Sequence, residues 1–257
     1  MRRADDPGGS RRQQVDDAAR CAGGGGNARS RGARQPGLIP LSPAAVPIAR
    51  GRDADVYAVD DDWVLRRYRN GGDVETEAAV MRHVAEHGFP VPHVRSAIGT
   101  DIVMRRLRGP TLLAGLMSLD VTVEAGAGVM AALHERLHRI EWPGGGGVVV
   151  HFDLHPDNIV MCPDGPMLID WSNARCGPAE LDVALSALIL AQVATDPAIG
   201  PLAASAGQLL GAFLAVVDDP APGLDGALAA RRRNPTMSDA ELAGLDAAAE
   251  LVLASRP

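Results

Sequence analysis

The sequence predicts an α+β protein with two lobes, a small antiparallel sheet carrying one helix and a larger, mostly helical part. Two observations lead to this prediction. Between residues 54 and 104, strand-like runs alternate with one amphipathic helix in the order strand, strand, helix, strand, strand. After Gly109 and Pro110, apolar residues recur at helical spacing instead. A chain of 257 residues, 46% of them hydrophobic, is long enough to bury a sizeable core.

The smaller lobe, the N-lobe, is expected over residues 37–107. Strand-like runs at 54–59 and 63–68 flank three consecutive aspartates, a pattern typical of a hairpin. The segment 73–87 opens with an aspartate that can cap a helix, places apolar residues on one face and is followed by a glycine. Two prolines then require an extended chain, and residues 98–104 have the pattern of a second hairpin.

The larger lobe, the C-lobe, is expected over residues 108–257. Residues 122–140 carry apolar side chains at helical spacing, and four glycines then break the chain before the β-branched residues 148–150. The apolar stretch 183–193 is too short to span a bilayer and is predicted to be a buried helix. Residues 238–241 form the capping-box pattern Ser-x-x-Glu, which we expect to open the last helix.

Residues 1–36 form a leader rich in Arg, Gly, Asp and Gln. Because they contain almost no large apolar side chains, we expect them to be disordered and dispensable. The formal net charge of the chain is −7, and the eight arginines and four aspartates of residues 1–35 give +4, which leaves −11 for the rest. An acidic body disfavours nucleic acid as a partner and suits a cationic substrate.

The three cysteines, Cys21, Cys162 and Cys176, have no regular spacing. They indicate neither a disulfide framework nor a zinc site, and they favour a reducing compartment. No apolar run approaches the roughly 20 residues that a membrane-spanning helix needs. We therefore expect a cytoplasmic protein that does not associate with membranes. The sequence does not indicate an oligomeric state.

The most informative segment follows the β-branched run at 148–150. It reads as a strand, a polar loop, a short strand, a turn and another short strand that ends in a carboxylate. This order can bring Asp153, Asn158 and Asp170 into one cleft. Phosphoryl transfer needs such a set, because one carboxylate orients the acceptor hydroxyl while oxygen ligands hold Mg²⁺ on the nucleotide phosphates. The loop and the strand end read His151-Phe-Asp153-Leu-His155-Pro-Asp157-Asn158 and Ile169-Asp170-Trp171.

These residues resemble the aminoglycoside phosphotransferase family, which has a protein-kinase-like fold and the motifs His-Gly-Asp-Leu-His-Pro-x-Asn and Ile-Asp-Trp. The resemblance implies that Asp153 is the catalytic carboxylate and that Asn158 and Asp170 are magnesium ligands. It also implies that Asp182 is a buried anchor of the catalytic loop. Phe152 replaces the usual glycine of the motif.

The implied function is transfer of the γ-phosphate of ATP to a hydroxyl of a small molecule, an aminoglycoside-like antibiotic or a metabolite, with ATP and Mg²⁺ as cofactors. The sequence does not identify the acceptor. Fold-level similarity extends to a kinase of a small hydroxyl compound and no further. The partners implied are this small-molecule substrate and neither nucleic acid nor membrane.

The resemblance extends more weakly into the N-lobe. Glu77 matches a helix glutamate that pairs with a strand cation, and Arg66 stands in the place of that cation. All 25 basic residues of the chain are arginine, so a lysine cannot fill this role. Gly51 is the one glycine in the loop expected to cover the phosphates, while Met104 and Leu107 resemble the hinge whose backbone pairs with adenine.

Two alternatives stay open at this point. The missing lysine and the sparse glycine loop are compatible with a nucleotide-binding pseudokinase. His151, Asp153 and His155 alternate as the ligands of a metal-dependent hydrolase can do. Within the kinase interpretation, we expect His151 to bond the backbone near Asp170, and His155 either to pack in the loop or to contact a phosphate. The arginines 231–233 are expected to face solvent.

Overall fold

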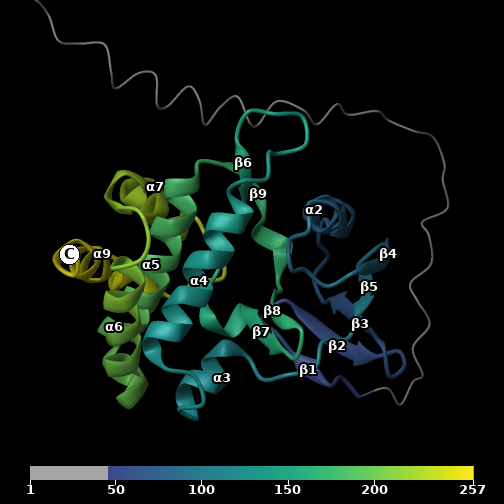
Figure 1. Ribbon diagram of the computed structural model, residues 1–257, viewed down its shortest axis with the longest axis horizontal. Helices are drawn as coiled ribbons and strands as arrows, with labels where there is room; N and C mark the ends of the chain where they lie inside the picture. Colours follow the sequence, from purple (N-terminus) through teal and green to yellow (C-terminus); the bar gives the residue numbers. More distant parts are fainter. Residues whose placement is uncertain (1–45, 257) are drawn as a thin grey trace, which may run out of the picture.

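The computed structural model describes residues 46–256, so the predicted leader and the first residues of the N-lobe lie outside the described part of the chain. The predicted fold class is confirmed. A small sheet with one helix lies beside a larger group of helices, and short strands lie between them (Figure 1). Within residues 46–256, no helix combines the length and the apolar character that a bilayer span requires.

The N-lobe contains one antiparallel sheet with the strand order β1-β2-β3-β5-β4. Both predicted hairpins are present. β2 pairs with β3 across the three aspartates, with Val56 opposite Arg66, and β4 pairs with β5 across a short turn. β3 is central and pairs with β5 on its other side. The strands are β1 (Ala49–Arg50), β2 (Ala54–Ala58), β3 (Trp63–Tyr68), β4 (Val94–Ile98) and β5 (Asp101–Arg105).

The single helix described in the N-lobe, α2 (Val74–Glu86), begins where the sequence predicts it. The Asp73 side chain accepts a hydrogen bond from the Thr76 N–H at 3.0 Å, which satisfies one of the unpaired donors of the first turn. Its apolar face packs against β4 and β5. Glu77 is buried on this helix, so α2 carries a carboxylate toward the site.

The C-lobe is built around α5 (Ala179–Thr195), whose central residues are buried, as predicted from the apolar stretch. Helices α6, α7 and α9 pack against it most extensively, and α4 contacts both α5 and α6 (Figure 1). The other helices are α3 (Leu112–Met117), α4 (Val123–Leu137), α6 (Pro201–Leu214), α7 (Ala221–Arg232), α8 (Asp239–Ala243) and α9 (Leu245–Ala254). A short 3₁₀ turn, η3 (Pro197–Ile199), precedes α6.

One prediction for the C-lobe is corrected. The Ser238–Glu241 capping box is present, but it opens α8, a helix of 5 residues, and not the last helix. The chain is interrupted at Gly244, and α9 follows as a separate helix. Glycine has a low helix propensity because it loses the most backbone entropy, which explains the break.

Short strands and turns between the lobes carry the polar loop. β6 pairs with β9, and β7 pairs with β8 in a separate hairpin. The loop after β6 therefore leads directly into the β7–β8 hairpin, which returns the chain to the same place. The elements are β6 (Val148–Val150), η1 (Pro156–Asn158), β7 (Ile159–Cys162), β8 (Gly165–Leu168), η2 (Trp171–Asn173) and β9 (Arg175–Gly177).

Candidate active site

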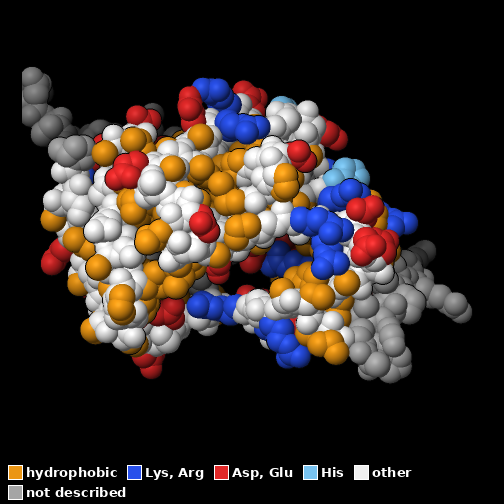
Figure 2. Space-filling view, turned by 60° about the horizontal axis from the view of Figure 1, so that its bottom comes forward, with side chains coloured by type: hydrophobic (Ala, Val, Ile, Leu, Met, Phe, Trp, Pro, Cys, Tyr) orange, Lys and Arg blue, Asp and Glu red, His pale blue; other side chains and the backbone are white. Residues whose placement is uncertain are grey.

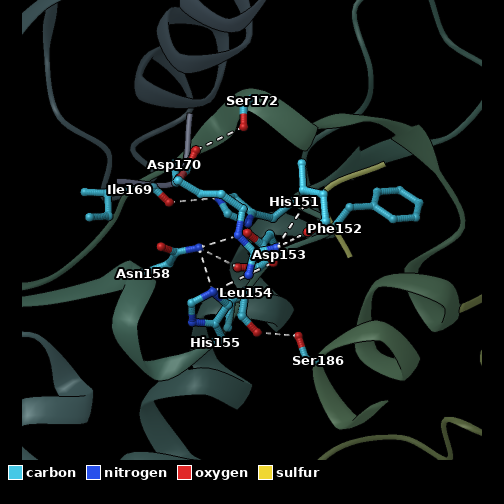
Figure 3. Close-up of polar contacts among 12 residues, drawn as sticks. His151, Phe152, Asp153, Leu154, His155, Asn158, Ile169, Asp170, Ser172 and Ser186 are labelled. Atoms are coloured by element: carbon cyan, nitrogen blue, oxygen red, sulfur yellow. Dashed lines mark hydrogen bonds and ion pairs between the residues drawn. The ribbon is translucent and has the colours of Figure 1, made fainter. Parts of the chain in front are cut away.

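Asp153 lies at the centre of a polar network formed by its own loop (Figure 3). The Asn158 side-chain amide donates to the Asp153 backbone carbonyl at 2.9 Å and faces Asp153 Oδ2 at 3.3 Å. The same amide nitrogen lies 3.1 Å from His155 Nε2, which here acts as the acceptor. About a quarter of the Asp153 side chain is exposed. The loop therefore presents a fixed carboxylate that a solute can reach.

Asp182 anchors the start of this loop from α5. Its side chain is buried, and it accepts hydrogen bonds from the backbone N–H groups of His151 at 3.0 Å and Phe152 at 2.7 Å. His138 Nε2 lies 2.9 Å from the same carboxylate, and His134 Nδ1 lies 3.6 Å from it. Burial raises the pKa of Asp182, but these histidines outweigh it and hold the pKa well below its ordinary value. This arrangement agrees with the expected anchoring position.

His151 has the structural place that the sequence predicts. Its imidazole is buried, and Nε2 donates to the backbone carbonyl of Ile169, the residue before Asp170, at 3.1 Å. Burial is the main cause that lowers its pKa, so the ring is neutral near pH 7. The bond ties the polar loop to the strand end that carries the second carboxylate. His151 is accordingly a positioning residue.

Arg66 bridges the two lobes. Its Nη1 donates to Glu77 Oε1 at 3.1 Å, and its Nη2 donates to Asp170 Oδ1 at 2.6 Å. The Tyr68 hydroxyl donates to the other oxygen of Glu77 at 2.6 Å, and the Arg66 guanidinium lies 4.8 Å from the Tyr68 ring centre. The expected pairing of Arg66 with Glu77 is therefore present. The contact with Asp170 connects the N-lobe sheet to the carboxylate at the end of β8.

The pKa values of the two carboxylates around Arg66 are shifted in opposite directions. Burial raises the pKa of Glu77 above its ordinary value, although Arg66 and the Tyr68 hydroxyl oppose the rise. Burial also acts to raise the pKa of Asp170, but Arg66 and a hydrogen bond from the Ser172 hydroxyl outweigh it and leave the pKa lowered. Asp170 is thus held as the anion, the form that a metal ligand requires.

The residues present fit a hard divalent cation. Asp170 Oδ1 is used by Arg66 and Ser172, while Oδ2 has no protein hydrogen bond within residues 46–256. Asn158 uses its amide nitrogen toward Asp153 and His155, and its oxygen points away from them (Figure 3). Carboxylate and amide oxygens are suitable ligands for Mg²⁺. Asp170 also has φ 64°, a left-handed conformation that is uncommon outside glycine and is frequent at functional sites.

The other residues predicted to contact the nucleotide lie in or next to the strands of the sheet that carries Arg66. Gly51 closes the turn between β1 and β2 and donates its N–H to the Ala54 carbonyl at 2.8 Å. The Met104 side chain is buried at the end of β5, and Leu107 follows after two residues. Within the described residues, the Leu107 peptide forms no backbone hydrogen bond, which leaves it available to a ligand.

The hinge is held closely against the C-lobe. Gly109 has φ 149°, and a Cβ at this position would lie 2.0 Å from the Met161 carbonyl oxygen. The Met161 N–H donates to the Pro110 carbonyl at 2.8 Å. Only glycine allows this approach of hinge and β7. Figure 2 shows the hollow that separates the two lobes, with basic side chains along its edge.

The hydrolase alternative is not supported. His151 is turned to the Ile169 carbonyl, and the group of three or more potential metal-ligating side chains found in residues 46–256 consists instead of His134, His138 and Asp182. In that group both Asp182 oxygens already accept backbone N–H groups, so we describe it as a hydrogen-bonded anchor. The sequence signal for it was the spacing of the two histidines by four on one helix face.

The interpretation of 231–233 as a solvent-facing run is wrong for Arg231 alone, since Arg232 and Arg233 are exposed. Arg231 is half-buried, and Arg231 and Arg233 line a pocket beside Asp153 together with Arg175. Arg232 is exposed and pairs with Asp246. No sequence pattern indicates this pocket, because α7 and the loop after it reach Asp153 only through the packing of the C-lobe.

The sequence of the chain identifies its family. The sequence matches the phosphotransferase enzyme family (APH) over residues 44–147 and 103–215, which together cover more than half of the chain. The chain belongs to this family. The resemblance stated from the loop motif is thereby confirmed, and the protein is an enzyme of the small-molecule kinase class. Among curated proteins, no match is found.

Solved structures of phosphotransferases share the fold of this family member. The ADP-bound aminoglycoside phosphotransferase APH(2″)-Ib has a TM-score of 0.51 at 14% identity, covering 82% of this chain and 92% of that chain. The streptomycin–ATP complex of APH(2″)-IIa has a TM-score of 0.50 at 13% identity, covering 84% and 99%. Amicoumacin kinase hAmiN with AMP-PNP, Ca²⁺ and Ami has a TM-score of 0.50 at 15% identity, covering 95% of this chain and 94% of that chain. At these identities, the similarity shows the fold alone.

Proposed function

We propose that this phosphotransferase transfers the γ-phosphoryl group of ATP to a hydroxyl of a small molecule, with Asp153 as the catalytic carboxylate. The observation that carries the proposal is the convergence of Asp153, Asn158 and Asp170 at one site (Figure 3), with Arg66 contacting Asp170 from the opposite lobe. The ADP, ATP and AMP-PNP complexes of the structural neighbours support a nucleotide as the donor.

The proposed step is an in-line displacement. The acceptor oxygen forms a bond to the γ-phosphorus, the bond from that phosphorus to the oxygen bridging to the β-phosphate breaks, and ADP leaves. Asp153 orients the acceptor hydroxyl and receives its proton. Its position is fixed by Asn158 and, through the backbone N–H groups at the start of the loop, by Asp182. Positioning and charge account for most of the catalysis in this class of reaction.

Asn158 and Asp170 would hold Mg²⁺, which would neutralise phosphate charge and bridge the nucleotide to the protein. Arg66 is proposed to bind phosphate oxygens while Glu77 holds its guanidinium, since arginine can contact a carboxylate and a phosphate at once. The turn at Gly51 would cover the phosphates. Met104 and Leu107 would offer the hinge backbone to the adenine.

Replacing Asp153 by asparagine tests the catalytic assignment. Asn keeps the size of the side chain but cannot accept the hydroxyl proton, so we expect turnover to fall by about 10²-fold or more while Mg-ATP binding is retained. Release of ADP in the presence of an acceptor measures turnover, and calorimetry measures binding. Equal turnover by Asp153→Asn and the wild type would contradict the role of Asp153.

The second candidate, a nucleotide-binding pseudokinase, rests on the missing lysine. The contacts of Arg66 with both Glu77 and Asp170 support the enzyme, because they are those that a cation replacing the lysine would make. A pseudokinase would bind Mg-ATP without acceptor-dependent release of ADP. An enzyme releases ADP and forms a phosphorylated acceptor in equal amounts, which mass spectrometry of the acceptor detects.

A further inference from the structure

A pocket of about 240 Å³ lies beside Asp153, on the C-lobe side of the site. Four segments line it: the polar loop, the η2–β9 connection, α5, and the end of α7 with the residues that follow. Its charged lining consists of one carboxylate, Asp153, and three guanidinium groups, those of Arg175, Arg231 and Arg233. Arg52, next to Gly51 in the β1–β2 turn, donates to Thr236 just beyond this lining. The pocket thus lies close to both the proposed catalytic carboxylate and the phosphate-covering turn.

The positive charge in this pocket is not neutralised by ion pairs among the described residues, although Glu241 lies near enough to Arg231, and Asp182 near enough to Arg175, to act on them electrostatically. Within residues 46–256, none of the three arginines forms an ion pair. Arg231 Nε donates to the neutral Gln192 side chain at 2.9 Å, and Arg175 Nε donates to the Asn173 carbonyl at 3.1 Å. By contrast, Arg232, between two of them in sequence, pairs with Asp246.

Two of the guanidinium groups are held in place by specific neighbours. The Arg175 guanidinium lies 4.3 Å from the centre of the Phe152 ring, a cation–π contact. Phe152, which replaces the glycine of the family motif, has φ 63°, so the loop keeps a glycine-like conformation while it presents a ring to the pocket. Gln192, from α5, fixes Arg231. Burial, followed by the like charge of Arg233, lowers the pKa of Arg175, which agrees with crowding of cations.

We infer that this pocket takes the acceptor, and that the acceptor carries a carboxylate or phosphate group in addition to the hydroxyl that is phosphorylated. This assignment rests on the proposed function. One negative charge facing three positive charges attracts an anion and repels a polycation such as an aminoglycoside. Arginine forks bind both carboxylate and phosphate through two hydrogen bonds. The volume is below the roughly 300–1,000 Å³ of drug-sized ligand sites, which favours an acceptor of about the size of one sugar.

The negative net charge outside residues 1–35, which favours a cationic substrate, is opposite in sign to the charge of this pocket. The net charge of −7 is a sum over the complete chain, whereas a ligand responds to the charges within about 10 Å at physiological salt. Local charge therefore decides the substrate class. Ion pairs elsewhere in residues 46–256 set arginines against carboxylates, whereas Arg175, Arg231 and Arg233 form none and lie together around one pocket.

Calorimetry on the full chain with Mg²⁺ and AMP-PNP tests the charge preference without requiring turnover. D-gluconate and D-glucose 6-phosphate are compared with D-glucose and D-glucosamine, which have the same number of carbons. We expect both anions to bind at least about tenfold more tightly than glucose, because a hydrogen bond to a charged group contributes about that factor. Glucosamine should bind most weakly. Binding of glucosamine as tight as that of the anions, or no anion binding at millimolar concentrations, would overturn the inference.

Substitutions of the pocket arginines test whether the anion preference arises from this pocket. Arg231→Gln and Arg175→Gln should each weaken gluconate binding by about tenfold or more, whereas the matched control Arg232→Gln should leave it unchanged. Equal affinity in all three variants would overturn the inference. Phosphorylation of glucosamine without anion binding would contradict the inference and support the proposed function. Binding of anions in this pocket without phosphoryl transfer to any of them would support the anion preference of the pocket and contradict the proposed function.

Discussion

Replacing Arg66 with alanine removes the cation between Glu77 and Asp170. The Arg66 side chain is 12% exposed and that of Glu77 is 4% exposed, so this is a buried ion pair. Removing one partner of such a pair costs about 3–5 kcal/mol. We use the lower end, about 3 kcal/mol, because the Tyr68 hydroxyl still donates to Glu77. Asp170 is 36% exposed, and solvent screening limits its further contribution to about 1 kcal/mol or less.

The stability that Arg66→Ala loses should increase with pH. The pKa of Glu77 is already raised in the folded protein, and removing Arg66 raises it further. A carboxyl with a raised folded pKa binds protons more strongly when folded than when unfolded, so its effect on stability becomes less favourable as the pH increases. Arg66→Ala should therefore lose more stability relative to the wild type at pH 8 than at pH 5.

Urea denaturation at the two pH values measures this effect, since urea leaves the ion pairs unscreened. The matched control is Arg105→Ala on the same sheet, whose side chain is 51% exposed and pairs with Asp62; its stability should change by about 0.5 kcal/mol or less. The stability of Arg66→Lys should lie between that of the wild type and that of Arg66→Ala, because one ammonium cannot bridge two carboxylates as the guanidinium fork does. Wild-type stability of Arg66→Ala at both pH values, together with an unchanged Michaelis constant for ATP, would refute the reasoning.

Four other variants test the anchor, the metal ligands and the hinge. Asp182→Asn should lower the free energy of unfolding by about 3 kcal/mol or more above pH 4, because an amide cannot accept both backbone N–H groups. Since the pKa of Asp182 is lowered in the folded protein, the difference from the wild type should shrink as the pH falls below 4. Urea denaturation measures both effects. Asp170→Ala should abolish Mg-ATP binding in calorimetry and Asn158→Ala should weaken it less; unchanged affinity in Asp170→Ala contradicts the assignment. Gly109→Ala should lower the free energy of unfolding by about 1–3 kcal/mol, because the new Cβ overlaps the Met161 carbonyl. A midpoint of thermal unfolding equal to that of the wild type would contradict this close contact.

Local patterns were sufficient for most of the N-lobe and for the polar loop. The β2–β3 hairpin depends on a short turn between two strand-like runs, and α2 depends on the Asp73 cap, so neighbouring residues decide both. The contact of His151 with the Ile169 carbonyl also follows from the motif, because the β7–β8 hairpin returns the chain to the loop. In each case the relevant partners lie close in sequence or are joined by one hairpin.

Interactions between distant segments could not be predicted in the same way. The spacing of His134 and His138 by four places both on one face of α4, but only the packing of α4 against α5 brings them to Asp182. Arg231 and Arg233 are part of a charged run that would normally be exposed. Their place in the pocket depends on the angle at which α7 crosses α5, which the sequence pattern of either helix does not determine.

The helix α5 connects these observations. It is buried on nearly all sides, and three of its polar residues reach the site or its lining. Asp182 holds the start of the polar loop, Ser186 donates to the Leu154 carbonyl at 2.7 Å in the same loop, and Gln192 holds Arg231. A buried polar group is costly unless it is hydrogen-bonded, so the first two are locked to the loop of Asp153. The same rigid helix thus positions the proposed catalytic carboxylate at one end and the proposed anion-binding arginine at the other. A change in the crossing of α5 and α7 would alter the acceptor pocket and leave the loop of Asp153 in place, so we expect acceptor specificity to vary more readily than the catalytic geometry.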